Sequence, residues 1–233
     1  MKVTLLILTL DEIQGVREIM PQLNSEWCDQ LIVVDGGSKD GTLEYLQEKG
    51  YSVILQKQPG PREAYLDALE HVDGDIIITF SPDGNSVPEI IPQLVSKMKE
   101  GYDLAIVSRY LDGAKSYDDS FISGLANKIF TLTINVLFGG HYTDALVIYR
   151  AYKKELIGLL ELDQESSYHL PEALFRKPMS WEMLLSIRCA KRRLKVAEIP
   201  GDEPCRIGGR RGLHWRWGFA YLLQMIREVF VWR

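Results

Sequence analysis

Oxygen-bearing side chains follow a run of β-forming residues in this 233-residue sequence. The run Ile76–Phe80 stops abruptly and is followed by Ser81-Pro82-Asp83-Gly84-Asn85. Carboxylate and amide oxygens two positions apart in a loop can face one hard cation such as Mg²⁺ or Mn²⁺, which prefers oxygen ligands. Asp83 and Asn85 therefore predict a metal site. The alternative is that both side chains only stabilise a turn through local backbone hydrogen bonds.

A second carboxylate ends the earlier β-rich run Leu31–Val34. Asp35 comes directly after that run and opens a glycine-rich loop that leads to a helix start near Thr42. Either Ser38 or Asp40 can cap this helix, so a cap does not explain Asp35. A carboxylate in this position can accept hydrogen bonds from a ribose or a base edge.

Basic side chains occupy two further segments. Arg109 follows the run Leu104–Ser108, and the planar guanidinium fork suits phosphate, although a surface ion pair with Asp112 is an equal alternative. Near the C-terminus, Arg206 and Arg210 lie in a glycine-rich loop. This loop is predicted to be flexible and able to close over phosphate groups.

The elements that must position these residues alternate between strand and helix. Such alternation predicts βαβ units, hence an α/β fold with a mainly parallel central sheet and helices on both faces. Ligands bind such sheets at the carboxyl ends of the strands, where the residues above are found. The predicted strands are Val3–Thr9, Leu31–Val34, Val53–Gln56, Asp75–Phe80 and Leu104–Ser108, and the predicted helices are Val16–Leu23, Thr42–Lys49, Pro61–His71 and Pro88–Glu100.

The remaining segments are less regular. Phe121–Phe138 has apolar residues at helical spacing and predicts a helix packed in the core. Asp144 precedes a strand-like apolar run. Leu159–Met179 shows little periodicity and is expected to be a mobile loop. A helix from Ser180 and a strand at Leu194–Ile199 follow.

We predict one domain over residues 1–212 and an aromatic, amphipathic helix over residues 213–233. Basic and aromatic residues together favour a membrane-surface helix, and a helix buried in a homo-oligomer interface explains the same pattern. A net charge of −5 gives no case for nucleic-acid binding. Three cysteines without metal-site spacing, and the lack of a visible secretion signal or transmembrane helix, predict a cytoplasmic protein.

Three motifs in order carry a resemblance to a known family. Thr9-Leu10-Asp11-Glu12 is similar to T-x-N-E, Val33–Thr42 to V-V-D-D-G-S-x-D-G-T, and Ser108-Arg109-Tyr110 to G-S-R-Y. Together with the basic loop after Glu203, they resemble family 2 glycosyltransferases of the GT-A fold, within the polyprenyl-phosphate (dolichol-phosphate mannose synthase-like) branch.

The resemblance implies a role for each matching residue. The family's metal motif is D-x-D, in which Ser81 here replaces the first aspartate, Asp83 matches the second and Asn85 matches a further polar position. A donor nucleotide would contact Thr9, Asp11, Glu12, Asp35 and Ser81, and phosphate groups would contact Arg109, Arg206 and Arg210.

The implied reaction is metal-assisted, inverting transfer of a sugar from a UDP- or GDP-sugar. The acceptor would be a polyprenyl phosphate or another glycan precursor, reached at the inner face of the cell membrane. An anionic lipid phosphate needs no general base, whereas a sugar hydroxyl does, and Asp144 and Glu182 are the candidates. Because Ser81 replaces an aspartate, the alternative is a non-catalytic protein that binds nucleotide sugars.

Overall fold

A sheet of seven strands in the order β3-β2-β1-β4-β6-β5-β7 forms the centre of the computed structural model, which describes residues 1–208 and 215–231. β1 to β4 are mutually parallel, β7 is parallel to β5, and β6 runs antiparallel between β4 and β5. The predicted mainly parallel sheet is confirmed. The strands are β1 (Val3–Thr9), β2 (Gln30–Asp35), β3 (Val53–Leu55), β4 (Ile76–Phe80), β5 (Leu104–Ser108), β6 (Arg150–Lys153) and β7 (Val196–Pro200).

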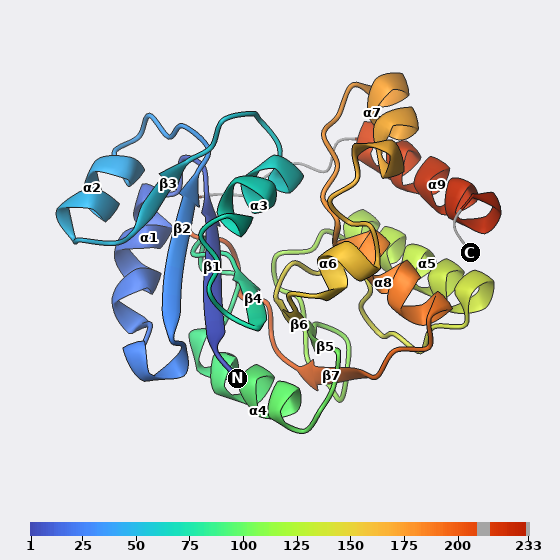
Figure 1. Cartoon of the computed structure of the whole chain (residues 1–233), viewed down its shortest axis with the longest axis horizontal. Helices are drawn as coiled ribbons and strands as arrows, with labels where there is room; N and C mark the ends of the chain where they lie inside the picture. Colours follow the sequence, from blue (N-terminus) through green and yellow to red (C-terminus); the bar gives the residue numbers. More distant parts are fainter. Residues whose placement is uncertain (209–214, 232–233) are drawn as a thin grey trace.

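Helices cover both faces of this sheet (Figure 1). Successive strand side chains point to opposite faces, so Leu5 and Ile7 pack with α1, α2 and α4, whereas Leu6 packs with α3 and α8. The helices are α1 (Ile13–Ile19), α2 (Thr42–Glu48), α3 (Pro61–Leu69), α4 (Ile91–Lys99), α5 (Phe121–Phe138), α6 (Leu156–Leu159), α7 (His169–Phe175), α8 (Glu182–Lys191) and α9 (Trp215–Phe230).

Strand register brings the predicted site residues to one edge. Thr9 at the end of β1 pairs with Asp35 at the end of β2, and Ile7 pairs with Phe80 at the end of β4. The loops after β1, β2 and β4 therefore begin side by side. This is the carboxyl edge, where α/β sheets bind their ligands.

Helix α5 is not the core helix that its periodicity predicted. It buries a narrow stripe containing Asn127, Thr131, Ile134 and Phe138 against the domain. Apolar residues lie on all sides of the helix, and those outside the buried stripe are not covered by the domain. Large exposed side chains are Phe121, Ile122, Leu125, Ile129, Leu132, Val136 and Leu137. By length and composition α5 could span a membrane, although no transmembrane helix was expected from the sequence.

The expectation of a mobile loop over Leu159–Met179 is wrong, because this segment contains α7 and a short 3₁₀ turn. Pro171 does not prevent helix formation, since it lies in the first turn, where backbone N–H groups have no intrahelical partner. Helix α9 packs beside α7 and α5 (Figure 1). A buried ion pair of 3.0 Å between Arg188 of α8 and Glu228 of α9 fixes it there.

Candidate active site

A cavity of about 270 Å³ opens at the carboxyl edge of the sheet, between the loops after β1 and β4 and the start of α3. The structure brings most of the predicted donor and metal residues into its wall. The predicted residues that line it are Thr9, Glu12, Ser81, Asp83, Asn85 and Arg206. We refer to this space as the donor cavity.

Asp83 is almost completely buried, with 1% of its surface exposed, yet its two carboxylate oxygens have different partners. Oδ1 accepts a hydrogen bond from the backbone N–H of Asn85 at 3.1 Å, which is the turn-stabilising bond that the alternative interpretation predicts. Oδ2 lies 2.9 Å from Nη2 of Arg206. The carboxylate therefore shapes the loop with one oxygen and holds a cation with the other.

The loop that carries Arg206 is closed over Asp83. The N–H of Ile207 donates to the backbone oxygen of Asp83 at 2.7 Å, and Nη1 of Arg206 lies 3.8 Å from Oε1 of Glu12. Gly84 makes this approach possible, because a Cβ there would lie 2.5 Å from Cγ1 of Ile207. Arg210, the other predicted phosphate ligand on this loop, lies outside the described residues.

Asp83 and Asn85 fit a divalent cation as two of its ligands. Both supply hard oxygen ligands, and Asp83 already holds a positive group in the structure. Residues 1–208 and 215–231 contain no group of three or more His, Cys, Asp or Glu arranged to hold a metal. The remaining ligands would therefore come from water and from diphosphate oxygens of a bound nucleotide, as is usual for Mg²⁺.

Asp35 and Asp11 connect the loops around the donor cavity. Asp35 is fully buried and accepts hydrogen bonds from the Thr9 hydroxyl at 2.9 Å and from the N–H groups of Gly37 and Ser38. Asp11 adopts a positive φ of 54° and accepts the N–H of Lys39 at 2.7 Å. Neither side chain lines the donor cavity, so nucleotide contact by these two residues stays a prediction.

Asp144 is sealed behind Arg109. Its carboxylate is 0% exposed and receives Nε and Nη2 of Arg109 at 2.6 and 3.1 Å, while the Asn127 amide donates at 3.1 Å. Burial alone would raise the pKa of Asp144, but the charge and hydrogen bonds of Arg109 outweigh it and lower that pKa. This arrangement suits a residue that orients Arg109 more than one that takes a proton from a substrate.

Glu182, the other candidate base, lies in the core at the start of α8. It accepts a short hydrogen bond from the hydroxyl of Tyr65, whose ring stacks on Trp181 at 4.5 Å between centroids. Burial, followed by the charge of Glu182, raises the pKa of Tyr65 well above its ordinary value. Glu182 does not line the donor cavity, and its catalytic role stays a prediction.

Two residues that sequence reasoning missed border the site. Gln56 follows β3, lines the donor cavity and donates to the backbone oxygen of Gly60 at 2.6 Å. Applying the strand-end rule to β3 would have found it. Glu203 forms an ion pair with Arg109 at 3.2 Å. In the sequence, the only hint of this role is that Glu203 is an acidic residue in a basic loop.

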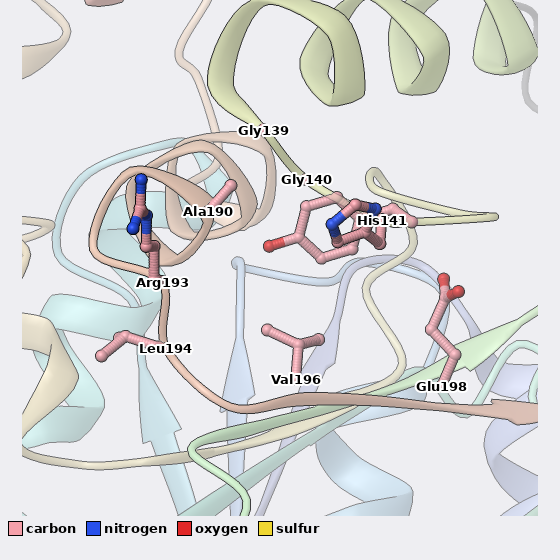
Figure 2. A pocket seen from close by; sticks show the side chains of 9 residues that line it. Gly139, Gly140, His141, Ala190, Arg193, Leu194, Val196 and Glu198 are labelled. Atoms are coloured by element: carbon pink, nitrogen blue, oxygen red, sulfur yellow. The ribbon is translucent and has the colours of Figure 1, made fainter.

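A separate cavity of about 440 Å³ lies between the C-terminal ends of α5 and α8 and strand β7. Figure 2 shows Arg193 and Glu198 on opposite sides of it, with His141 on the Glu198 side. Glu198 accepts the N–H groups of Thr143 and Asp144 at 2.8 to 3.0 Å, so it supports the backbone behind the site. No predicted site residue lines this cavity.

Comparison with known proteins gives one family match. The family model described as glycosyl transferase family 2 matches residues 22–159. A dolichol-phosphate mannosyltransferase of Pyrococcus furiosus is 26% identical, over 97% of this chain and 63% of the relative. An undecaprenyl-phosphate 4-deoxy-4-formamido-L-arabinose transferase of Aeromonas hydrophila is 30% identical, over 62% of this chain and 47% of the relative. The chain thus spans about half to two thirds of the length of these curated relatives.

Solved structures share the fold. A glucosyl-3-phosphoglycerate synthase from Mycobacterium tuberculosis, in complex with Mn²⁺, UDP and phosphoglyceric acid, superposes with a TM-score of 0.71. The two sequences are 20% identical, and the match covers 99% of this chain and 79% of the other. At this identity the likeness shows the GT-A fold alone, which agrees with the fold implied by the sequence motifs.

Proposed function

The chain belongs to glycosyl transferase family 2, and from this we propose that it transfers a sugar from a nucleoside-diphosphate sugar to a polyprenyl phosphate. The observation that carries the proposal is the cluster of Asp83, Glu12 and Arg206 at the carboxyl edge of the sheet, beside the donor cavity. Two relatives that act on lipid phosphates by name support the acceptor class.

The chemistry requires charge stabilisation. An acceptor phosphate oxygen forms a bond to the anomeric carbon while the bond from that carbon to the β-phosphate oxygen breaks, so the nucleoside diphosphate leaves with the electron pair. A divalent cation bound at Asp83 and Asn85 would stabilise the negative charge on the leaving diphosphate. Arg206 faces the same space and can bind diphosphate oxygens once it leaves Asp83. Attack opposite the leaving group inverts the anomeric centre.

An anionic acceptor removes the need for a general base, which agrees with the placement of Asp144. Arg109 lines a neighbouring cavity together with Arg206 and would bind the acceptor phosphate, with Asp144 fixing the orientation of its guanidinium group. If the acceptor is the hydroxyl of another glycan precursor, a carboxylate must take its proton. Asp144 and Glu182 are both buried, and a role as this base stays a prediction for each.

We propose that the lipid acceptor is reached through an apolar helical face on α5, α7 and α9. The exposed apolar residues of α7 and α9 on this face are Leu170, Leu174, Phe219, Leu222, Ile226, Val229 and Phe230. Exposed charges on these helices are basic, at Lys128 and Arg216, which suits an anionic membrane surface. Helix α5 also starts close to the site, because Tyr110 bonds Asp119 just before it.

Binding to lipid vesicles tests this surface. Wild-type protein should sediment with anionic vesicles, and Ile129→Asp should reduce the bound fraction, whereas Gln47→Asp, which makes the same change of charge on the exposed surface of α2, serves as the control. A stable dimer in solution with no vesicle binding would assign the same surface to a homo-oligomer contact instead.

Nucleotide binding tests the donor assignment. A thermal-shift screen of nucleoside diphosphates should find one preferred base, with stabilisation that increases when Mn²⁺ or Mg²⁺ is added. Asp83→Asn should remove the metal-dependent part, because the amide has no negative charge. Binding in both proteins with no metal effect would contradict the metal assignment. Binding without turnover of any nucleotide sugar would favour the non-catalytic alternative.

A further inference from the structure

A smaller cavity, of about 250 Å³, continues from the donor cavity along the sheet edge and forms a second space at this edge. Asn85, Ile148 and Arg206 line both spaces, so a ligand in one lies next to a ligand in the other. Arg109 and Glu203 line only the second space, which we call the acceptor cavity. Its position beside the predicted metal site is where a sugar acceptor must approach the donor.

Arg109 has a fixed side and a cavity side. Nε and Nη2 bond the buried carboxylate of Asp144, whose side chain is 0% exposed. Nη1 instead lies 3.2 and 3.3 Å from the two oxygens of Glu203, whose side chain is 12% exposed, and 3.9 Å from Oδ2 of Asp119. Asp144 thus cannot be reached by a ligand, whereas Glu203 occupies the edge of the guanidinium group that a ligand would use.

Backbone hydrogen bonds place Glu203 at this edge. Its N–H donates to the backbone oxygen of Lys115 at 2.9 Å, its own backbone oxygen accepts the N–H of Tyr117 at 2.8 Å, and the Ser116 hydroxyl donates to its carboxylate. Burial raises the pKa of Glu203, partly opposed by Arg109. An acidic side chain that lines the acceptor cavity is therefore held, at a desolvation cost, against Nη1 of Arg109.

We propose that Glu203 is a specificity-determining residue, which occupies the anion site of Arg109 until the phosphate group of the acceptor displaces it. The inference rests on the proposed function. A phosphate monoester carries about −1.5 to −2 charges at pH 7 and three acceptor oxygens, so it competes better for a guanidinium group than one carboxylate does. A neutral hydroxyl group cannot displace Glu203, and such acceptors are excluded from Arg109.

The competing role for Glu203 is that of a general base for a hydroxyl acceptor. The two roles predict opposite effects of Glu203→Gln, which keeps the size of the side chain and its ability to accept from Ser116. Removing a competing anion should strengthen phosphate binding. Removing a base should abolish transfer, whatever happens to phosphate binding.

The experiment measures inorganic phosphate binding by calorimetry, at one low ionic strength. Glu203→Gln should bind phosphate about tenfold more tightly than wild type, because one charge-assisted competitor of Arg109 is gone. Asp202→Asn is the matched control, since the neighbouring carboxylate lines the same cavity and bonds the Lys115 N–H instead of Arg109. The increase in phosphate affinity should also appear when Glu203→Gln is combined with Arg206→Gln, which would show that the phosphate binds Arg109.

Kinetics completes the test. For polyprenyl phosphate, Glu203→Gln should lower KM and leave kcat within about twofold, which a merely structural role would not produce. Unchanged phosphate affinity would overturn the inference, and a collapse of kcat would make Glu203 the base. If wild type turns over no nucleotide sugar while Glu203→Gln still gains phosphate affinity, the proposed function has failed and the anion site of Arg109 stands.

Discussion

Replacing Arg206 should raise the affinity for a divalent cation, because Arg206 occupies the Asp83 oxygen that the cation would use. The guanidinium group lies 2.9 Å from Oδ2 of Asp83, with side chains 18% and 2% exposed. A divalent cation that uses this oxygen must displace Arg206. A charge-assisted hydrogen bond in a partly exposed site contributes about 1 to 2 kcal/mol. Arg206→Gln should therefore bind Mn²⁺ about tenfold more tightly without nucleotide.

The same variant should bind nucleoside diphosphate more weakly, because the arginine that would move onto the diphosphate is missing. Free and bound Mn²⁺ can be counted by electron paramagnetic resonance, with and without the preferred nucleotide. Arg193→Gln is the control, since Arg193 lines the separate cavity of Figure 2. Equal or weaker Mn²⁺ binding to Arg206→Gln without nucleotide would refute the competition between Arg206 and the metal.

Other residues give further predictions. Ser81→Asp adds a carboxylate to the donor cavity and should tighten Mn²⁺ binding, and an unchanged affinity would count against Asp83 as a ligand. Asp144→Asn leaves Arg109 without its buried partner and should cost about 3 to 5 kcal/mol in urea unfolding. Because the pKa of Asp144 is lowered in the folded state, the difference in unfolding free energy between wild type and Asp144→Asn is present above about pH 4 and shrinks as the pH falls. Glu228→Gln should cost a similar amount if α9 is part of the folded domain, whereas a loss below about 0.5 kcal/mol would make α9 a loosely attached helix.

The strand-end residues show how much of the site could be predicted from the sequence. Apolar runs that stop on polar residues located β1, β2 and β4, and parallel pairing then brings Thr9 and Asp83 to the same edge. Sequence spacing cannot reveal which of these side chains faces a cavity. Asp35 obeys the strand-end rule as well as Asp83 does, yet its carboxylate is fully used by Thr9 and the loop after it.

Long-range pairing explains the parts that could not be predicted. Arg109 and Asp144 are separated by 35 positions, and Arg109 and Glu203 by 94, so their ion pairs depend on the whole fold. Hydrophobic periodicity also fails for α5, because a helix that is apolar all round has the same pattern whether it is covered by protein or exposed as α5 is.

Product formation tests the central claim most directly. Purified protein would be incubated with the nucleotide sugar of the preferred base, Mn²⁺ and a polyprenyl phosphate in anionic vesicles, and the lipid analysed by mass spectrometry. We predict a glycosylated lipid phosphate together with an equal amount of nucleoside diphosphate, and neither product with Asp83→Asn. Tight nucleotide binding by wild-type protein with no glycosylated lipid and no release of nucleoside diphosphate would contradict the account.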